Sequence, residues 1–219
     1  MPSHRHTYLG LAMLALLFTN LLIASHTASA ADEWQKLFNG KDLTGWVEIG
    51  KQGSWQAADG ILYCSGKGGG WLSTDKTYAN FELDLEFRVP ADGNSGVFIR
   101  APREGDGAYL GMEIQVLDDD TTAFGKLKPE QFTGSIYDVQ AASPRATKKA
   151  GEWQHMVILC DGRHVKVTIN DKVVVDAKLD DYPAKFATHP GLKRTDGYIG
   201  LQNHGSRLDY RNLKIRELP

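Results

Sequence analysis

The sequence predicts an all-β chain folded as an antiparallel β-sandwich or jelly roll. About a dozen short segments carry the apolar patterns of strands, and only two short segments have any helical character. Turn residues, such as the run Asp92-Gly93-Asn94, separate many of these segments. Many short strands without intervening helices fit two packed antiparallel sheets.

The predicted strands follow one another from residue 46 to residue 217. Each has apolar residues at alternate positions or in a short run, bounded by Gly, Asp, Asn or Pro. In order, they span residues 46–49, 54–57, 61–64, 71–74, 81–89, 96–101, 110–117, 134–139, 153–160, 164–169, 173–179, 197–203 and 208–217. The two helical candidates are residues 126–132 and 181–186.

Two local pairings are expected within this order. Asn170-Asp171 joins two alternating segments and predicts a tight hairpin turn. The segments 96–101 and 110–117 are about ten residues apart, which is short enough for adjacent antiparallel strands.

The N-terminal segment has the features of an export signal. A basic start at His4-Arg5-His6 precedes an apolar run over residues 9–23, which is short for a membrane span. Ala28-Ser29-Ala30 fits a cleavage site. We therefore expect a signal peptide over residues 1–30 and a single domain over residues 31–219, secreted or periplasmic. An uncleaved anchor is the alternative, and the lack of a cysteine near the cleavage point argues against a lipid anchor.

Charge and cysteine content narrow the possible partners. The net charge is −2, and it becomes −3 without residues 1–30, whose single charged residue is Arg5. This balance predicts neither nucleic acid nor an anionic membrane as a partner. Cys64 and Cys160 lie in predicted strands, where a disulfide and two separate buried thiols are both open. The oligomeric state is not indicated.

Polar groups gather on one face of two predicted neighbouring strands. In the run 112–118, Glu113 and Gln115 share the face opposite Met112 and Ile114. In the run 94–100, alternation places Arg100 with Phe98, so that pairing would bring Arg100 and Glu113 onto one surface. Such a surface suits a sugar, and an ordinary solvent-facing ion pair is the alternative.

Several longer runs carry a family resemblance. They are Leu37-Phe38-Asn39-Gly40-Lys41-Asp42-Leu43-Thr44-Gly45-Trp46, Asp59-Gly60-Ile61-Leu62, Asn94-Ser95-Gly96-Val97-Phe98-Ile99-Arg100, Glu113-Ile114-Gln115-Val116-Leu117-Asp118, Thr133-Gly134-Ser135-Ile136-Tyr137, Gly151-Glu152-Trp153, Gly200-Leu201-Gln202-Asn203-His204-Gly205 and Tyr210-Arg211-Asn212-Leu213. In this order, across residues 34–217, the chain resembles the 3-keto-disaccharide hydrolase domain family. The resemblance implies a concanavalin A-like jelly roll. Met112 departs from the pattern, because an aromatic residue usually precedes the Glu-Ile-Gln run.

The resemblance also implies a substrate, a glycoside oxidised at carbon 3 of its sugar. The ketone acidifies the hydrogen on carbon 2, so that a base can start elimination of the group on carbon 1. Such a site needs a base, a group that stabilises the enolate oxygen and an acid for the leaving group. We assign Glu113 as the base and Arg100 as the stabiliser, with Tyr137 or His204 as the acid.

The remaining candidates would bind the sugar. Asn94, Gln115, Asp118 and Gln202 could hold hydroxyl groups, and Trp71 could stack on a sugar ring. No cofactor is expected, although Asp118-Asp119-Asp120 is open to two interpretations, a solvated turn or a Ca²⁺ site. The predicted partner is a small sugar.

Two other functions remain open. The alternating run Phe81-Glu82-Leu83-Asp84-Leu85-Glu86-Phe87 resembles the catalytic strand of laminarinase and lichenase-type retaining glycosidases, with Glu82 and Glu86 as the acid pair. The same run also fits a strand whose outward charges are paired with basic neighbours. A lectin-like module without catalysis is the third possibility, because one fold can host either function.

Overall fold

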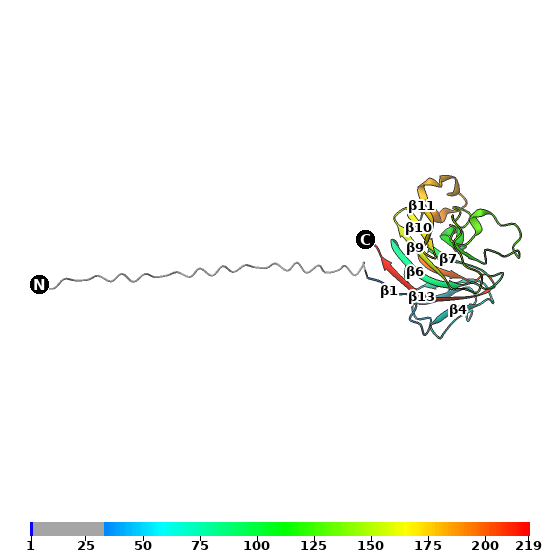
Figure 1. Ribbon diagram of the computed structural model, residues 1–219, viewed down its shortest axis with the longest axis horizontal. Coiled ribbons are helices and arrows are strands. Elements are labelled where there is room, and N and C mark those ends of the chain that lie inside the picture. Colours follow the sequence, from blue (N-terminus) through cyan, green and yellow to red (C-terminus); the bar gives the residue numbers. More distant parts are fainter. Residues whose placement is uncertain (2–32) are drawn as a thin grey trace.

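The computed structural model describes Met1 and residues 33–219, which form two antiparallel sheets packed face to face (Figure 1). The larger sheet contains, in spatial order, β11 (Lys172–Lys178), β10 (His164–Ile169), β9 (Gln154–Asp161), β6 (Phe81–Arg88), β13 (Arg207–Glu217), β4 (Ile61–Ser65) and β3 (Trp55–Ala58), with β1 (Gln35–Lys36) paired to β13. The smaller sheet contains β2 (Trp46–Ile49), β5 (Trp71–Thr74), β12 (Tyr198–Gln202), β7 (Asn94–Ala101) and β8 (Met112–Leu117). The predicted all-β jelly-roll architecture is confirmed.

Alternation along the strands produces the core between the sheets. In β6 every second side chain, from Phe81 to Phe87, is fully buried. Val97, Ile114 and Leu201 of the smaller sheet belong to the same apolar cluster. Burial of such side chains contributes roughly 1.5–3 kcal/mol each, so this layer dominates the stability of the fold.

Short helical segments punctuate the loops. They are α1 (Gly107–Leu110), η2 (Pro129–Gln131), η3 (Leu179–Asp181), η4 (Pro183–Lys185) and η5 (Pro190–Lys193). The predicted helices over 126–132 and 181–186 are therefore single 3₁₀ turns. Isolated segments of this length do not repay the cost of helix nucleation.

Three details differ from the sequence prediction. Residues 134–139 form isolated bridges, Ile136 with Ile114 and with Gln140, instead of a strand. The strand predicted to begin at Leu110 begins at Met112, because α1 occupies the preceding four residues. The two-residue β1 was not expected, and it is too short to give a pattern.

The expected hairpin is confirmed at the turn between β10 and β11. Asn170 and Asp171 both have positive φ, 46° and 66°, which is the conformation a two-residue hairpin turn requires. The pairing of β7 with β8 is also antiparallel as expected, with Phe98 opposite Glu113.

The two cysteines are free and buried. Cys64 lies on β4 and Cys160 on β9, and β13 and β6 lie between these strands. Three strand spacings amount to about 14 Å, which is well beyond the reach of a disulfide. The alternative of two separate thiols is therefore the one that the structure contains.

The predicted signal peptide lies, apart from Met1, outside the described residues. None of the helices in the described part of the chain has the length and apolar character that a membrane crossing needs.

Candidate active site

A bulge in β7 decides which side chains reach the outer face of the smaller sheet. Gly200 of β12 pairs with Phe98, whereas Tyr198 pairs with Ala101, so β7 carries one extra residue in this interval. Arg100 lies there with a positive φ of 51°. The bulge interrupts the alternation that would otherwise have placed Arg100 beside Phe98.

Arg100 is fully buried, and the expectation that it shares a groove with Glu113 is wrong. Its guanidinium donates to the carbonyl oxygen of Ala79 at 2.8 Å and to that of Gly162 at 2.7 Å. Ala79 precedes β6, and Gly162 lies in the turn between β9 and β10. The arginine therefore joins the end of the smaller sheet to loops of the larger one, a structural role.

Six of the nine predicted site residues line one cavity of about 150 Å³. They come from β7, β8, the end of β12 and the loop after η2, and they are Asn94, Glu113, Gln115, Tyr137, Gln202 and His204. Asp106, Ala108 and Tyr109, from α1 and its N-cap, complete the lining. We call this cavity the Glu113 pocket.

The backbone of β7 makes room for the central carboxylate. A Cβ atom at Gly96 would lie 1.9 Å from Glu113 Oε1, so any larger residue would displace the carboxylate. Gly96 does not need unusual backbone angles here, since its φ is not positive. Its role is to allow close approach.

Glu113 is the most unusual group in the pocket. Its side chain is only 4% exposed, and within residues 33–219 its carboxylate has neither an ion pair nor a hydrogen-bond donor. Burial, with smaller contributions from Asp106 and Asp138, raises its pKa to about 8. A buried carboxyl group without a partner is costly to ionise, which is typical of groups that transfer protons.

Two carboxamides of the pocket also lack protein partners. Asn94 Oδ1 and Gln202 Oε1 are buried and accept no hydrogen bond within the described residues. Buried polar groups are usually paired, and the exceptions cluster at functional sites. These amide oxygens are therefore suited to accept hydrogen bonds from the hydroxyl groups of a ligand.

Tyr137 and His204 are further members of the pocket lining. The Tyr137 hydroxyl accepts a hydrogen bond from Gln131 Nε2 at 3.0 Å, and burial raises the pKa of this phenol. His204 is exposed, and its ring lies 6.3 Å from that of Phe124 in an edge-on arrangement. Gln115 donates to the carbonyl oxygen of Gln131 at 3.3 Å, which fixes its side chain along the pocket wall.

The contribution of α1 to the pocket is not predicted by the sequence pattern. Asp106 caps this helix by accepting from Ala108 N at 3.0 Å, and its charge adds to the raised pKa of Glu113. Tyr109 packs against Tyr137 with ring centroids 6.5 Å apart. The acidic N-cap residue Asp106 is the one sequence feature that points to this helix. The helix itself has four residues, which are too few to show a helical repeat of apolar side chains.

Two predicted sugar-binding residues lie outside the Glu113 pocket. Trp71 is 5% exposed and packs its ring edge-on to Phe98 at 5.5 Å, above Gly200. Asp118 accepts from Asp92 N at 2.9 Å and from Asp120 N at 3.2 Å. Both residues support the walls of the site instead of lining it.

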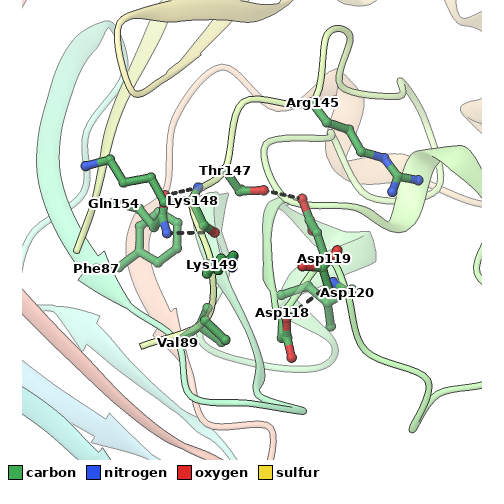
Figure 2. A pocket seen from close by; sticks show the side chains of 12 residues that line it. Phe87, Val89, Asp118, Asp119, Asp120, Arg145, Thr147, Lys148, Lys149 and Gln154 are labelled. Atoms are coloured by element: carbon green, nitrogen blue, oxygen red, sulfur yellow. Dashed lines mark hydrogen bonds between the residues drawn. The ribbon is translucent and has the colours of Figure 1, made fainter. Parts of the chain in front are cut away.

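The acidic run after β8 braces a loop. Asp119 accepts from Thr133 N and from the Thr147 hydroxyl, each at 2.9 Å, and Figure 2 shows the second of these bonds. Among the described residues, no three His, Cys, Asp or Glu side chains are grouped so that they could hold a metal ion. The run therefore serves as a tie between the loops that follow β8 and precede β9.

The acidic row on β6 is fully paired. Arg216 contacts Glu82, Arg211 contacts Glu86 at 2.6 Å, and His155 contacts Asp84 at 3.0 Å. This is the arrangement expected of an outward strand face with basic neighbours. It argues against Glu82 and Glu86 as a catalytic pair, because neither is free to act on a substrate.

A family model matches nearly all of the described residues. Residues 33–216 match the 3-keto-alpha-glucoside-1,2-lyase-like domain. The chain is 30% identical to a 3-keto-disaccharide hydrolase of Bacteroides thetaiotaomicron over 230 aligned positions, covering 86% of this chain and 79% of that protein.

Two solved structures extend the comparison. A candidate glycosyl hydrolase from Parabacteroides distasonis is 32% identical, with a TM-score of 0.76 over 85% of this chain and 100% of that one. A protein of unknown function with a galectin-like fold from Bacillus subtilis is 13% identical, with a TM-score of 0.55 over 84% of this chain and 98% of that one. The second likeness concerns the fold alone.

Proposed function

Since the chain belongs to the 3-keto-alpha-glucoside-1,2-lyase-like family, whose members act on carbohydrates, we propose that it cleaves 3-keto-glycosides by elimination at the Glu113 pocket. The observation that carries this proposal is the buried, unpaired carboxylate of Glu113. The relative named a 3-keto-disaccharide hydrolase supports the substrate class.

Glu113 is the proposed base. A ketone at carbon 3 of the sugar acidifies the hydrogen on carbon 2, yet this hydrogen remains a weak acid. A carboxylate whose pKa is near 8 is a stronger base than an ordinary glutamate, so it is better matched to this task. Removal of the hydrogen leaves the electron pair in an enolate on the carbon 3 oxygen.

The enolate oxygen needs a hydrogen-bond donor, and Arg100 is too far into the core to supply one. The Asn94 and Gln202 side chains line the pocket, and their NH₂ groups are the neutral donors that could reach this oxygen. A fixed neutral donor in a site shielded from water stabilises developing charge effectively. We assign these two side chains to the oxygen atoms on carbons 2 and 3.

The leaving group needs a proton on the glycosidic oxygen, and Tyr137 and His204, which line the pocket, are the candidate donors. The bond from carbon 1 to this oxygen breaks as the enolate collapses, which forms a double bond between carbons 1 and 2 and restores the ketone. The leaving group takes one proton and departs as an alcohol. Addition of water across the new double bond then gives the 3-keto sugar, so that the net reaction is hydrolysis.

The test compares a chromogenic 3-keto-glucoside with the same glucoside before oxidation. The proposal expects turnover of the keto substrate alone, with loss of that turnover in Glu113→Gln. Turnover of the plain glucoside or of a β-glucan by the wild type would replace it with the glycosidase interpretation. Binding of the keto substrate without turnover would instead favour a lectin-like module.

We further propose that the enzyme works outside the cytoplasm, as a single domain after removal of residues 1–30. The support is the N-terminal sequence alone, with its apolar run and its small-residue cleavage site. Mass spectrometry of the exported protein should find an N-terminus at or near Ala31. An intact N-terminus on a membrane-bound product would contradict this.

A further inference from the structure

A second cavity, of about 230 Å³, adjoins the Glu113 pocket and is lined in part by the loop that follows β8. Four residues line both cavities, and they are Asn94, Gln115, Tyr137 and His204. The lining that belongs to the second cavity alone is Leu117, Phe124, Lys126, Leu127 and Gln131. The two cavities are therefore adjacent, and the residues that line only one of them differ in character.

The junction fixes the direction of a bound substrate. Glu113 lines only the first cavity, so carbon 2 of the keto sugar must lie there. Tyr137 and His204, the proposed proton donors for the leaving group, line both cavities. The scissile bond then lies at the junction, and the group that leaves must extend into the second cavity.

The second cavity adds three apolar side chains, Leu117, Phe124 and Leu127, to the polar residues that it shares with the first. Phe124 is 40% exposed, which makes it one of the few large apolar side chains on the surface of the described part of the chain. Its ring meets the His204 ring edge-on, with centroids 6.3 Å apart. Exposed aromatic residues beside a cavity commonly serve as platforms for a ring.

The loop that carries Phe124 is held firmly at both ends. Asp118, at the start of the loop, accepts from the backbone of Asp92. Asp119 accepts from Thr133 N and from the Thr147 hydroxyl, and Figure 2 shows the bond from Thr147. These bonds position the loop over β8 before any ligand arrives. A platform on a braced loop loses little entropy when a ligand binds.

From this geometry, and resting on the proposed function, we infer that the cavity under Phe124 is a leaving-group subsite that takes a ring with a flat apolar face. An aryl group and a second pyranose ring share this property. Lys126, a lining residue with an exposed side chain, can donate to hydroxyl groups and would favour the sugar.

The experiment measures kcat and KM for three 3-keto-glucosides whose leaving groups are methyl, phenyl and a second glucose. Phe124→Ala should lower kcat/KM about 3- to 10-fold for the two ring-bearing substrates, through KM, as expected for loss of one stacking contact. The methyl glycoside should change less than twofold. Each ratio compares one substrate in two proteins, so differences in intrinsic leaving ability cancel.

Two variants serve as controls. Phe124→Tyr keeps the ring and should restore the wild-type values. Val173→Ala removes another exposed apolar side chain, on β11 at the far edge of the larger sheet, and should change nothing. Lys126→Met separates the two kinds of ring, because only the glucose leaving group should then bind more weakly. Equal losses for all three substrates in Phe124→Ala, or no loss, would overturn the inference.

A binding measurement tests the subsite independently of the proposed reaction. Titration of the unoxidised phenyl and methyl glucosides, followed by ligand NMR, does not depend on turnover. Preferential binding of the phenyl form that disappears in Phe124→Ala would support the subsite even if no keto substrate reacts. Equal binding of both forms by the wild type would contradict the subsite, whatever the outcome of the turnover assay.

Discussion

Two sets of carboxylates on the outer faces of the two sheets differ in a way that separates function from stability. On the larger sheet, Glu82, Asp84 and Glu86 of β6 each contact a basic side chain and remain partly exposed. On the smaller sheet, Glu113 of β8 is almost fully buried and has no partner among the described residues. The charges of the three β6 carboxylates are neutralised by their basic neighbours. The charge of Glu113 can be neutralised only by a proton or by a bound ligand.

The contrast shows that residue type and alternation do not identify a catalytic carboxylate. In both strands apolar and polar residues alternate, and the polar face carries carboxylates, three in β6 and one in β8. The difference comes from what covers each face, since α1 and the loop after η2 close over Glu113 and bring Asp106 and Asp138 near it. Desolvation and the nearby negative charges then raise the pKa of Glu113, whereas ion pairs stabilise the charged form of the β6 carboxylates.

The largest expected effect is that of removing the unpaired carboxylate. Glu113→Gln keeps the shape of the side chain and abolishes its basicity, so kcat for a 3-keto-glycoside should fall about 10²–10⁴-fold. Glu82→Gln and Glu86→Gln, which alter only paired carboxylates, should stay within about twofold of the wild type. If the two β6 variants are inactive while Glu113→Gln is active, the site lies on the larger sheet.

Displacement of the same carboxylate should be nearly as damaging. A Cβ atom at residue 96 would lie 1.9 Å from Glu113 Oε1, so Gly96→Ala must push the base aside. A misplacement of about 1 Å can cost roughly 10²-fold in rate. The double variant Gly96→Ala/Glu113→Gln should be no slower than Glu113→Gln alone, because both changes act through one group. Additive losses would show that Gly96 acts independently of Glu113.

The pH profile should report the raised pKa directly. A base must be ionised, so kcat/KM should rise by about tenfold per pH unit below the pKa and level off above about 8. Asp106→Asn keeps an N-cap acceptor but removes one of the charges that raise this pKa, so its profile should move to lower pH. Glu82→Gln should leave the profile unchanged. A rate that is flat from pH 6 to 9 would exclude Glu113 as the base.

Much of this arrangement was accessible from the sequence because it depends on local periodicity. Alternation placed Glu113 and Gln115 on the outer face of β8, and the turn residues Asn170 and Asp171 gave the hairpin. The runs that contain Asn94, Tyr137, Gln202 and His204 were singled out through the family resemblance, and the structure gathers them into one pocket.

The rest depended on tertiary structure. Arg100 fits the alternating pattern of β7, but one extra residue reverses its direction, and nothing in the sequence marks the position of that bulge. Trp71 is of a residue type that commonly stacks on sugars, yet whether its ring faces the pocket or supports the wall depends on its packing with Phe98. Phe124 lies in a loop whose shape is set by bonds from Asp118 and Asp119 to distant residues. Such long-range contacts leave no periodic signal.

The last expected effect concerns stability, where the two sets of carboxylates should differ in sign. The folded-state pKa of Glu113, about 8, is above the ordinary value of 4.5, so its contribution to stability is full below about pH 4.5 and is lost as the pH rises through about 8. Glu113→Gln should therefore be more stable than the wild type at pH 9, by an amount on the order of 5 kcal/mol, and the gain should vanish near pH 4. Glu82→Gln loses one surface ion pair, worth about 0.2–1 kcal/mol, and should be slightly less stable at neutral pH. Urea unfolding of the three proteins at pH 4, 7 and 9 measures both effects. A Glu113→Gln variant that is less stable than the wild type at pH 9 would mean that the native carboxylate has a stabilising partner, and the proposed base would lose its physical basis.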